Sequence, residues 1–342
     1  MQMPSISLCM IVKNEEEFIE RCLKSVHELV HELIIVDTGS NDRTLEICKK
    51  YNAAIYPYQW GDHFADARNF GLSRANGDWI LWLDADEELE TSKSQLMMDF
   101  ITQTDASMLF MPIINYYGDT LPVKQEQAYY YHQPRLFRNN LGVKFYNRIH
   151  ETPNFPEQED SRYKSETLEV PIHHYGYIKE ITTKKKKSQR NLHLLQEEYQ
   201  NPGHSPWIEY HLASEFYRNQ DYGIAFTYIN ESILGFLLQG LKPPAILYRL
   251  KYGILYETNS IDGACSSIEK ALLLYPDYVE LHFIKGLMLF YKEEYSDALD
   301  SFEKCLKLGE NHSEYLIMKG SGSFNALHYK ESCLSKLNST KI

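Results

Sequence analysis

The first half of the chain alternates short apolar runs with segments in which apolar residues recur every three or four positions. The short runs predict buried strands, and the periodic segments predict helices that pack on them. We expect strands at residues 5–12, 33–36, 53–58 and 79–87, and helices at residues 15–29, 44–51 and 65–75. Strands separated by helices of this length are typical of right-handed crossovers in a mostly parallel sheet. Ligands of such sheets bind beyond the carboxyl ends of the strands.

Residues 105–177 follow a different pattern. They are rich in Tyr and Asn, and they combine short β-prone runs with several prolines. This pattern predicts an antiparallel extension of the sheet with long loops. Because binding residues often lie on loops, we expect this stretch to form one side of a site.

After residue 178 the pattern becomes helical, and it repeats after 34 positions: Ala264, Ile268 and Ala271 return as Ala298, Phe302 and Cys305, and Gly286, Tyr295 and Ala298 return as Gly320, Tyr329 and Ser332. Helix pairs with a 34-residue period are the tetratricopeptide pattern. The alternative is an irregular helical bundle in which the spacing arises by chance. We therefore expect an α/β domain over residues 1–180 and an all-α, tetratricopeptide-like domain over residues 181–342.

Composition and charge narrow the class of protein. The 342 residues are enough for two domains with sizeable cores. A formal net charge of -12 repels polyanions, which argues against nucleic acid as a main partner. The six cysteines form no CxxC pair and lie mostly in apolar segments, as expected of reduced thiols. We recognise no signal peptide and no apolar run of the ~20 residues that a membrane span needs, so we expect a soluble cytoplasmic protein.

Two acidic residues follow the last predicted strand of the first half. Asp84 and Asp86 end the run WILWLDAD, and residues two apart in a strand point to the same side. Both carboxylates can then hold one divalent cation at the carboxyl edge of the sheet, and such oxygen ligands favour Mg²⁺ or Mn²⁺. An ion there can bridge a diphosphate and neutralise the charge of a departing phosphate. The alternative is a solvated acidic turn.

Asp37 ends the second predicted strand, in the run LIIVDTGS. A carboxylate at this place can accept hydrogen bonds from a nucleobase or a ribose, as acidic residues do in other doubly wound folds. It can equally cap the helix that begins near Thr44 or close the DTGSND turn. The sequence contains neither a GxGxxG loop nor a P-loop motif, so a diphosphate would be bound through a metal ion and side chains.

Four segments, taken together and in this order, resemble family 2 glycosyltransferases: SLCMIVKNEEEFIERCLKSV, ELIIVDTGSNDRT, DHFADARNFGLSRANGDWILWLDADEEL and NRIHE. The sequence is similar to members that carry tetratricopeptide-like helices after a GT-A catalytic domain, such as the SunS-type peptide S-glycosyltransferases and the lipooligosaccharide glucosyltransferases. The resemblance covers residues 5–180 by motif and the rest by architecture. It implies transfer of a hexose from a nucleotide sugar, with a UDP-sugar as donor, Mn²⁺ or Mg²⁺ as cofactor and inversion at the anomeric carbon.

The resemblance also implies roles for individual residues. The residues that it places around the nucleotide are Ile11, Lys13, Glu15, Asp37, Arg68 and Asp84. Asp84 and Asp86 should hold the ribose and the metal, with Asp86 as the direct metal ligand. Many members have Pro and Tyr where this chain has Ile11 and Lys13, so the aromatic ring that stacks on the base is missing at this position.

An inverting transfer needs a base that takes the proton of the acceptor. Glu151, in NRIHE, is the candidate that the resemblance indicates, and a surface Glu paired with Arg148 is the alternative. Asp62 is a weaker candidate. Of two adjacent histidines, His174 is preferred over His173 as a further metal ligand, because the alternation along its strand places it on the apolar side.

The sequence leaves the acceptor substrate and the oligomeric state undecided. We expect a peptide or protein acceptor held by the helical repeats, whose surface suits extended chains. A surface glycan or a lipid-linked saccharide is the alternative acceptor, and a non-catalytic repeat scaffold is the alternative function. The incomplete last repeat leaves a helix face that can pair with a second copy in a homodimer.

Overall fold

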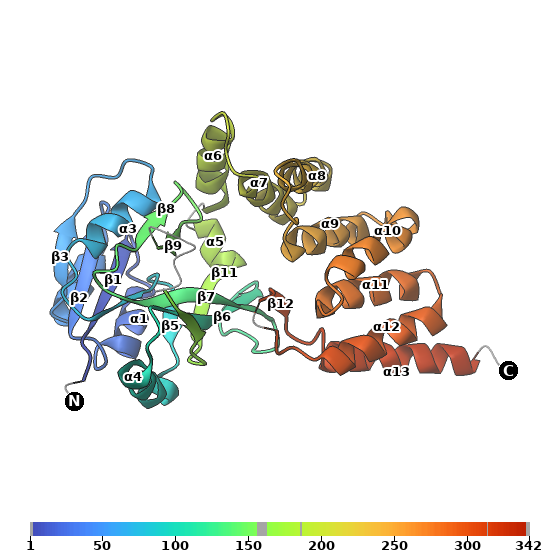
Figure 1. Cartoon of the computed structure of the whole chain (residues 1–342), viewed down its shortest axis with the longest axis horizontal. Coiled ribbons are helices and arrows are strands. Elements are labelled where there is room, and N and C mark those ends of the chain that lie inside the picture. The colour runs from blue at the N-terminus through green and yellow to red at the C-terminus, as the bar shows by residue number, and fades with distance from the viewer. Residues whose placement is uncertain (1–2, 156–162, 185–186, 313, 340–342) are drawn as a thin grey trace. The chain divides into compact units, whose positions relative to one another are not determined.

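The computed structural model describes residues 3–155, 163–184, 187–312 and 314–339. The chain divides into two compact units, whose elements are labelled in Figure 1. Met1–Val123 and Tyr131–Lys185 form an α/β unit, and Lys124–Tyr130 with Lys186–Ile342 form a helical unit. The predicted fold class, a mixed-sheet α/β domain followed by an all-α domain, is confirmed.

Four parallel strands form the first part of the sheet, in the order β3-β2-β1-β4. The elements are β1 (Ile6–Val12), α1 (Ile19–Val26), β2 (Glu32–Asp37), α2 (Thr44–Lys50), β3 (Ala54–Pro57), α3 (Phe64–Leu72) and β4 (Trp79–Trp82). Their order along the chain is the predicted one. Because the strands are parallel, their carboxyl ends meet at one edge of the sheet, where Asp37 ends β2 and Asp84 follows β4.

The second part of the sheet is mixed. β7 (Ala128–Arg138) runs antiparallel to β4, and the order continues with β6 (Met108–Gly118), β11 (Ile172–Ile178) and β5 (Glu87–Leu89). β11 and the short β10 (Ser165–Thr167) run parallel to β6, whereas β5 runs antiparallel to β11. The predicted antiparallel extension is therefore wrong for β10 and β11. The chain reaches them from β7 by a long connection, which permits the parallel direction that a hairpin excludes.

Shorter elements complete the α/β unit. They are η1 (Thr91–Lys93) and α4 (Ser94–Gln103) between β5 and β6, the two-stranded sheet of β8 (Lys144–Tyr146) and β9 (Thr152–Asn154), and α5 (Lys179–Lys184) after β11.

The predicted strand over residues 79–87 is interrupted. β4 ends at Trp82, and the chain turns before β5 begins at Glu87. The turn closes through two reciprocal hydrogen bonds: the Asp84 amide donates to Glu87 Oε2 at 2.8 Å, and the Glu87 amide donates to the Asp84 carbonyl at 3.0 Å. Asp84 and Asp86 therefore lie in a turn, and the rule that strand residues two apart share a face does not place them.

Apolar side chains cover both faces of the sheet. Leu8, Met10 and Leu81 belong to one buried cluster, and Cys9 and Ile80 belong to another. Burial on both faces explains why β1, β2 and β4 read as continuous apolar runs and not as alternating ones. All six cysteines are free thiols. None of the helices in the described part of the chain combines the length and the apolar composition that crossing a bilayer requires.

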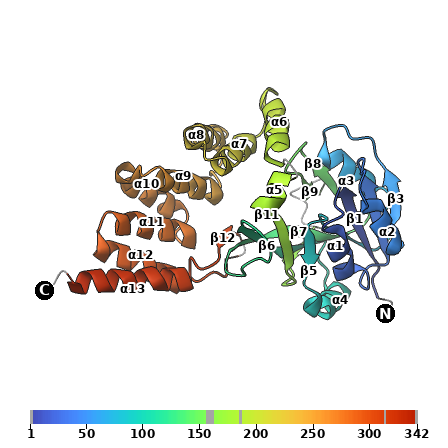
Figure 2. The same ribbon diagram turned by 180° about the vertical axis from the view of Figure 1, so that it is seen from behind.

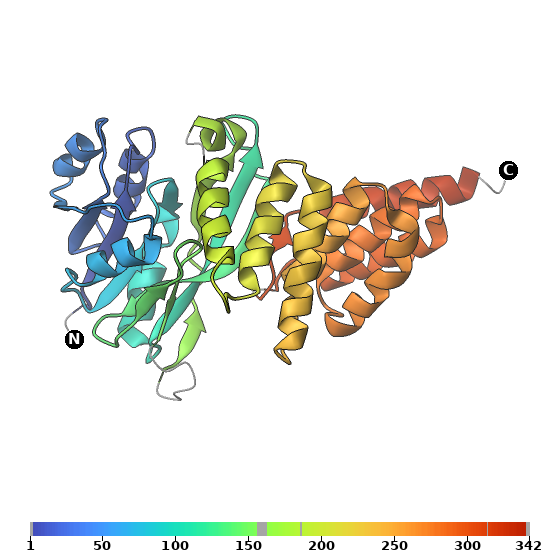
Figure 3. The ribbon, with the colours of Figure 1, turned by 90° about the horizontal axis from the view of Figure 1, so that it is seen from above.

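The helical unit is a stack of helices that follow one another in sequence order (Figures 2 and 3). They are α6 (Lys187–Tyr199), α7 (Trp207–Arg218), α8 (Tyr222–Leu238), α9 (Ala245–Glu257), α10 (Ile261–Leu274), α11 (Val279–Tyr291), α12 (Tyr295–Leu308) and α13 (Phe324–Ser339). Small residues lie where helices touch: the buried ring of Phe302 in α12 packs directly on Gly286 in α11. This contact is the one that the repeat pattern requires.

The last predicted copy of the repeat has no first helix. Gly286 lies inside α11, but its counterpart Gly320 lies in a turn with a φ of +100°. The preceding residues include the two-residue strand β12 (Ile317–Met318), which pairs antiparallel with Tyr129 and Tyr130 of β7. Hydrogen bonds from the Tyr278 hydroxyl to the Leu316 carbonyl and from the Met318 amide to Glu280 hold this stretch extended, so a helix cannot form there.

We predict opposite effects for two alanine substitutions in the helical unit. A Cβ at Gly286 would lie 2.7 Å from the Phe302 ring, so Gly286→Ala should lower the free energy of unfolding by about 1–3 kcal/mol. Gly253 in α9 has nothing within 4 Å of the added carbon, so Gly253→Ala should be neutral or stabilising by up to about 1 kcal/mol. Urea unfolding followed by circular dichroism measures both. Equal stability changes in the two variants would contradict the packing described here.

Candidate active site

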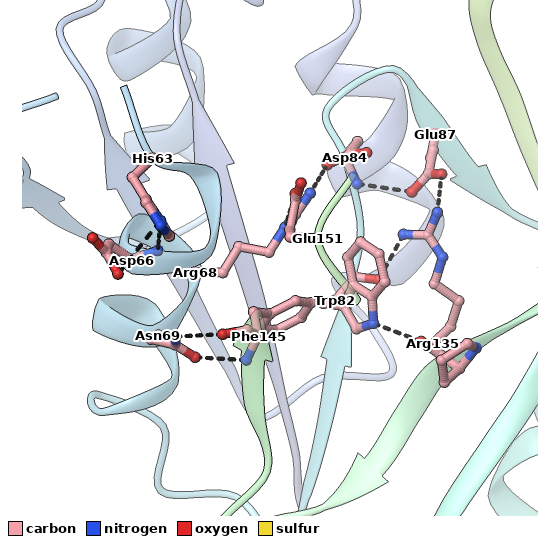
Figure 4. A network of polar contacts seen from close by, with 11 residues as sticks. His63, Asp66, Arg68, Asn69, Trp82, Asp84, Glu87, Arg135, Phe145 and Glu151 are labelled. Carbon is pink, nitrogen blue, oxygen red and sulfur yellow. Dashed lines mark hydrogen bonds and ion pairs between the residues drawn. The ribbon is translucent and has the colours of Figure 1, made fainter. Parts of the chain in front are cut away.

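A buried guanidinium lies at the centre of the polar cluster beyond β4 (Figure 4). Arg68, on α3, is only 7% exposed. Its Nε donates to Glu151 Oε1 at 2.6 Å, and its Nη2 donates to Asp84 Oδ1 at 2.8 Å. The three residues come from a helix, from the turn after β4 and from the loop before β9. The fold thus brings together three of the residues that the sequence marked as functional.

The ion pairs set the charge states of this cluster. Burial alone would raise the pKa of Asp84, but the guanidinium groups of Arg68 and Arg135 outweigh that effect and leave the pKa below its usual range. Burial would likewise lower the pKa of Arg68, and the carboxylates of Asp84 and Glu151 raise it above its usual value instead. Arg68 therefore stays cationic, and Asp84 stays ionised well into the acidic range.

Glu151 does not have the surface partner that the alternative interpretation gave it. Its carboxylate is 10% exposed and binds Arg68, whereas Arg148 donates from Nε to the Asp62 carbonyl at 2.8 Å. The weaker base candidate, Asp62, has a left-handed φ of +54° and accepts a hydrogen bond from Trp60 Nε1 at 2.8 Å. Of the two base candidates, only Glu151 belongs to the Arg68 cluster.

Asp86 and His174 form a second contact in the same region. His174 Nε2, on β11, lies 3.5 Å from Asp86 Oδ1, and both side chains are largely buried. His174 Nδ1 lies 2.7 Å from Asn115 Oδ1, an oxygen that can only accept, so Nδ1 carries the hydrogen. With its hydrogen on Nδ1 alone, the ring would present its Nε2 lone pair to the Asp86 carboxylate. Such an arrangement favours a cation between the two atoms, because a second group that holds the far nitrogen is typical of metal-bound histidine.

His173 has different partners. Its Nδ1 lies 2.9 Å from the Tyr116 hydroxyl, and its Nε2 lies 3.3 Å from Glu90 Oε2. The alternation along β11 thus sends the two adjacent histidines to different places.

The residues fit a divalent cation only in part. Donor atoms 3.5 Å apart can share one ion at metal–ligand distances of ~2.1 Å, and carboxylate with imidazole is a donor set that Mn²⁺ accepts. Asp84, however, binds Arg68. Across the described residues, the group of three potential ligands whose donor atoms lie within 4.8 Å of one another is elsewhere, at Asp277, His312 and Glu314. A cation at Asp86 and His174 would thus need oxygens from a bound substrate.

The residues expected around the nucleotide separate into two groups. Ile11 and Arg68 line one cavity together with Val36 and Trp82. Lys13 and Glu15 are not among its lining residues: Lys13 is exposed, and the Glu15 amide donates to Thr44 Oγ1 at 2.7 Å.

Asp37 shows the feature of its structural alternative. It is 8% exposed, and its Oδ1 accepts a hydrogen bond from the Ser40 amide at 2.9 Å, which closes the turn after β2. Among the described residues, Asp37 Oδ2 has no hydrogen-bond partner, so the turn uses only one of the two carboxylate oxygens.

The sequence analysis did not identify three residues of the cluster, namely Trp82, Glu87 and Arg135. Glu87 and Arg135 form a buried ion pair of 2.6 Å, and the Trp82 ring lies between the side chains of Arg68 and Arg135 (Figure 4). Glu87 follows the acidic pair directly, but Arg135 lies on β7, 48 residues later. No spacing rule connects the two, because β7 becomes the neighbour of β4 only in the folded sheet.

Comparison with known proteins identifies this part of the chain. Residues 7–171 match the sequence model of glycosyl transferase family 2. Over these residues the chain is therefore similar to family 2 glycosyltransferases, and the Arg68 cluster lies within the matched segment. The resemblance that the sequence motifs indicated is confirmed.

Individual relatives extend the match into the helices. A TPR repeat-containing protein of Synechococcus elongatus is 30% identical over 278 residues, which cover 79% of this chain and 66% of that protein. The SPbeta prophage-derived glycosyltransferase SunS of Bacillus subtilis is 28% identical over 215 residues, which cover 60% of this chain and 48% of SunS. The chain thus spans between about half and two thirds of the length of these relatives. The crystal structure of S. aureus TarS 1-349 covers 72% of this chain and 86% of its own at 14% identity and a TM-score of 0.41, too weak a likeness to bear on function.

We predict that the Arg68 cluster makes stability depend on pH. In Arg68→Met, the carboxylates of Asp84 and Glu151 lose their shared cation, which should cost about 2 kcal/mol at pH 7, less than the 3–5 typical of fully buried pairs because Asp84 is partly exposed. The pKa of Asp84 is lowered, so the wild-type ion pair stabilises the fold above the unfolded-state pKa near ~4 and loses this effect as the pH falls through the lower folded-state pKa. As the pH falls, the uncompensated carboxylates of the variant take up protons before the paired carboxylates of the wild type do. The stability difference between Arg68→Met and the wild type should therefore shrink between pH 7 and about 4.5.

Urea unfolding at the two pH values measures the deficit. Arg43→Met is the matched control, because Arg43 pairs with Glu16 at the surface and its loss should leave the stability almost unchanged at either pH. An Arg68→Met deficit that is the same at both pH values would exclude the charge-based explanation.

Proposed function

We propose that this protein is a metal-dependent, inverting glycosyltransferase that transfers a hexose from a UDP-sugar to a peptide or protein. The observation that carries the proposal is the convergence of Asp84 and Glu151 on one buried Arg68 beside the Asp86–His174 contact. These groups lie beyond the carboxyl end of β4, in a family 2 domain, where ligands of such sheets bind.

Asp86 and His174 would hold the cation, and Asp84 would meet the ribose. A Mn²⁺ or Mg²⁺ ion, when bound, supplies positive charge to the leaving diphosphate. The cavity that Ile11, Val36 and Trp82 line holds only about 10 Å³, so a base would bind outside it, at the carboxyl edge of the sheet. Arg68, a permanent cation held by Asp84 and Glu151, would add positive charge beside the phosphates. Asp37, at the end of β2, retains a carboxylate oxygen for the uracil or the ribose.

Glu151 acts as the general base. It takes the proton from the acceptor, whose lone pair forms the new bond to the anomeric carbon on the face opposite the diphosphate. The bond between that carbon and the diphosphate oxygen breaks, and UDP leaves with the electron pair. A single displacement of this kind inverts the anomeric centre. A thiol acceptor needs less help from the base, because a thiol is already partly ionised near neutral pH.

The helical unit is the reason for proposing a peptide or protein as the acceptor. Stacked helix pairs offer a long surface for an extended chain. One part of that surface is already covered by the chain itself: Tyr129 lies under the Arg249 guanidinium of α9 at 4.8 Å, and Met318 binds Glu280 of α11. An acceptor segment would use the helix surface that β7 and β12 leave open.

We predict that donor binding stabilises the protein only when a metal ion is present. UDP with Mn²⁺ at 100 times the dissociation constant should stabilise the fold by about 2.7 kcal/mol, which a thermal melt records as a higher Tm. Asp86→Ala should abolish the part of the shift that depends on Mn²⁺. A matched control is Asp66→Ala, since Asp66 is exposed on the first turn of α3 and should keep the full shift. No stabilisation of the wild type by any nucleotide sugar would favour the scaffold function instead.

We predict that Glu151→Gln separates binding from transfer. The amide keeps the size of the side chain but cannot take a proton, so transfer should fall by about 10²–10⁴-fold while UDP binding persists. Product formation is measured by mass spectrometry on a Cys- and Ser-containing peptide and, in parallel, on an oligosaccharide. Full turnover by Glu151→Gln would remove this residue from the mechanism. Modification of the oligosaccharide alone would replace the peptide acceptor by a glycan.

A further inference from the structure

A second buried ion pair lies next to the Asp84 turn. Arg135 Nη2, on β7, lies 2.6 Å from Glu87 Oε1, at the start of β5, and the two side chains are 4% and 0% exposed. At this depth neither group can reach a bound substrate. Taking two charges out of water costs about as much free energy as their attraction returns, so such a pair is weak support for the stability of a fold. We therefore explain the position of the Glu87–Arg135 pair by a role in the candidate site and not by its contribution to stability.

Glu87 connects the ion pair to the turn that carries the acidic residues. Its two carboxylate oxygens have different partners: Oε1 accepts from Arg135, and Oε2 accepts from the Asp84 amide at 2.8 Å. The Glu87 amide in turn donates to the Asp84 carbonyl at 3.0 Å. Arg135 thereby fixes the carboxylate that fixes the turn.

Arg135 also connects to the central cation through Trp82. Its guanidinium carbon lies 3.8 Å from the centre of the Trp82 ring, and the guanidinium carbon of Arg68 lies 4.5 Å from the same ring. The ring itself is held by a 2.7 Å hydrogen bond from Nε1 to the Pro134 carbonyl, the residue before Arg135 (Figure 4). Trp82 is therefore a rigid spacer whose position β7 determines, and Arg68 rests against it.

We propose that Glu87 and Arg135 are positioning residues of the donor site. They hold the Asp84 turn through a hydrogen bond and Arg68 through the Trp82 ring, and they touch neither the donor nor the acceptor. The inference rests on the proposed function, because it names what keeps the donor-binding groups in place. A purely structural role is the competing explanation, and it predicts a different response to removal of both charges.

The paired substitution Glu87→Met with Arg135→Met separates the two explanations. Removing one partner leaves an uncompensated buried charge, whereas replacing both by apolar side chains of similar size is often neutral for stability. The double variant should therefore unfold at a urea concentration close to that of the wild type. It still lacks the acceptor for the Asp84 amide, so the turn should be loose.

Two measurements follow on the double variant and on Arg135→Lys, which keeps the charge but loses the planar group that stacks on Trp82. Isothermal titration with UDP in the presence of Mn²⁺ should give a dissociation constant at least about tenfold higher than that of the wild type. Hydrogen exchange should show the Asp84 amide exchanging at least about tenfold faster in the double variant. Glu87→Gln, which keeps an oxygen for the Asp84 amide, should restore most of the amide protection.

A buried pair outside the α/β unit is the matched control. Arg249 and Glu280 bind each other in the helical unit, so Arg249→Met with Glu280→Met should leave the affinity for UDP unchanged. A wild-type protein that binds no UDP would refute the proposed function, and the exchange of the Asp84 amide would still test the positioning role. Unchanged UDP affinity together with unchanged amide protection in the double variant would overturn the positioning role alone.

Discussion

The arrangement of the candidate site depends on one buried cation shared between two carboxylates. Without Arg68, Asp84 and Glu151 would be two negative charges facing each other in a region of low dielectric, where like charges repel strongly and tend to take up a proton. With Arg68, each carboxylate is held at a hydrogen-bonding distance, and the lowered pKa keeps Asp84 ionised. The same side chain lies against Trp82, so the cation is fixed on one side by charge and on another by an aromatic surface.

Layers behind this cation keep it in place. Trp82 separates Arg68 from Arg135, Arg135 binds Glu87, and Glu87 closes the turn that carries Asp84. The contacts of Arg135 with Trp82 and Glu87 join β7 to residues 53 and 48 positions earlier in the chain, whereas the contact of Glu87 with Asp84 is local. The proposed function requires a diphosphate to be held without a glycine-rich phosphate loop. Its ligands would then be side chains with several rotatable bonds, which need such a support.

The two units are not divided at a single point of the sequence. Residues 124–130 belong to the helical unit, where Tyr129 contacts Arg249 and Tyr130 donates to the Glu310 carbonyl, while the rest of β7 belongs to the sheet that holds the site. A fragment that ends near residue 180 would therefore lose the partners of residues 124–130. The break in the repeat has the same origin, since the extended residues around Ile317 pair with β7 where a first repeat helix was expected.

Much of the fold follows from local pattern, but the interactions between distant residues do not. The alternation of apolar runs and helical periods predicted β1, β2, β3 and β4 and the helices between them, because each of those signals lies within one element. The turn after Trp82 was missed because an apolar residue, Leu83, continues the strand pattern past the point where β4 ends. The parallel direction of β11 was missed because connection length, not composition, decides it.

The site divides in the same way. By itself the sequence marked the candidate site residues, since Asp84, Asp86, Arg68, Glu151 and His174 stand in motifs whose residue types and order limit what they can do. Only the tertiary structure decided which of them meet: Arg68 with both Asp84 and Glu151, His174 rather than His173 with Asp86, and Arg135 with Glu87. The physical reason is that a motif fixes chemical identity within a few residues, whereas an ion pair between residues 48 or 83 positions apart exists only after the sheet has brought their strands and loops together.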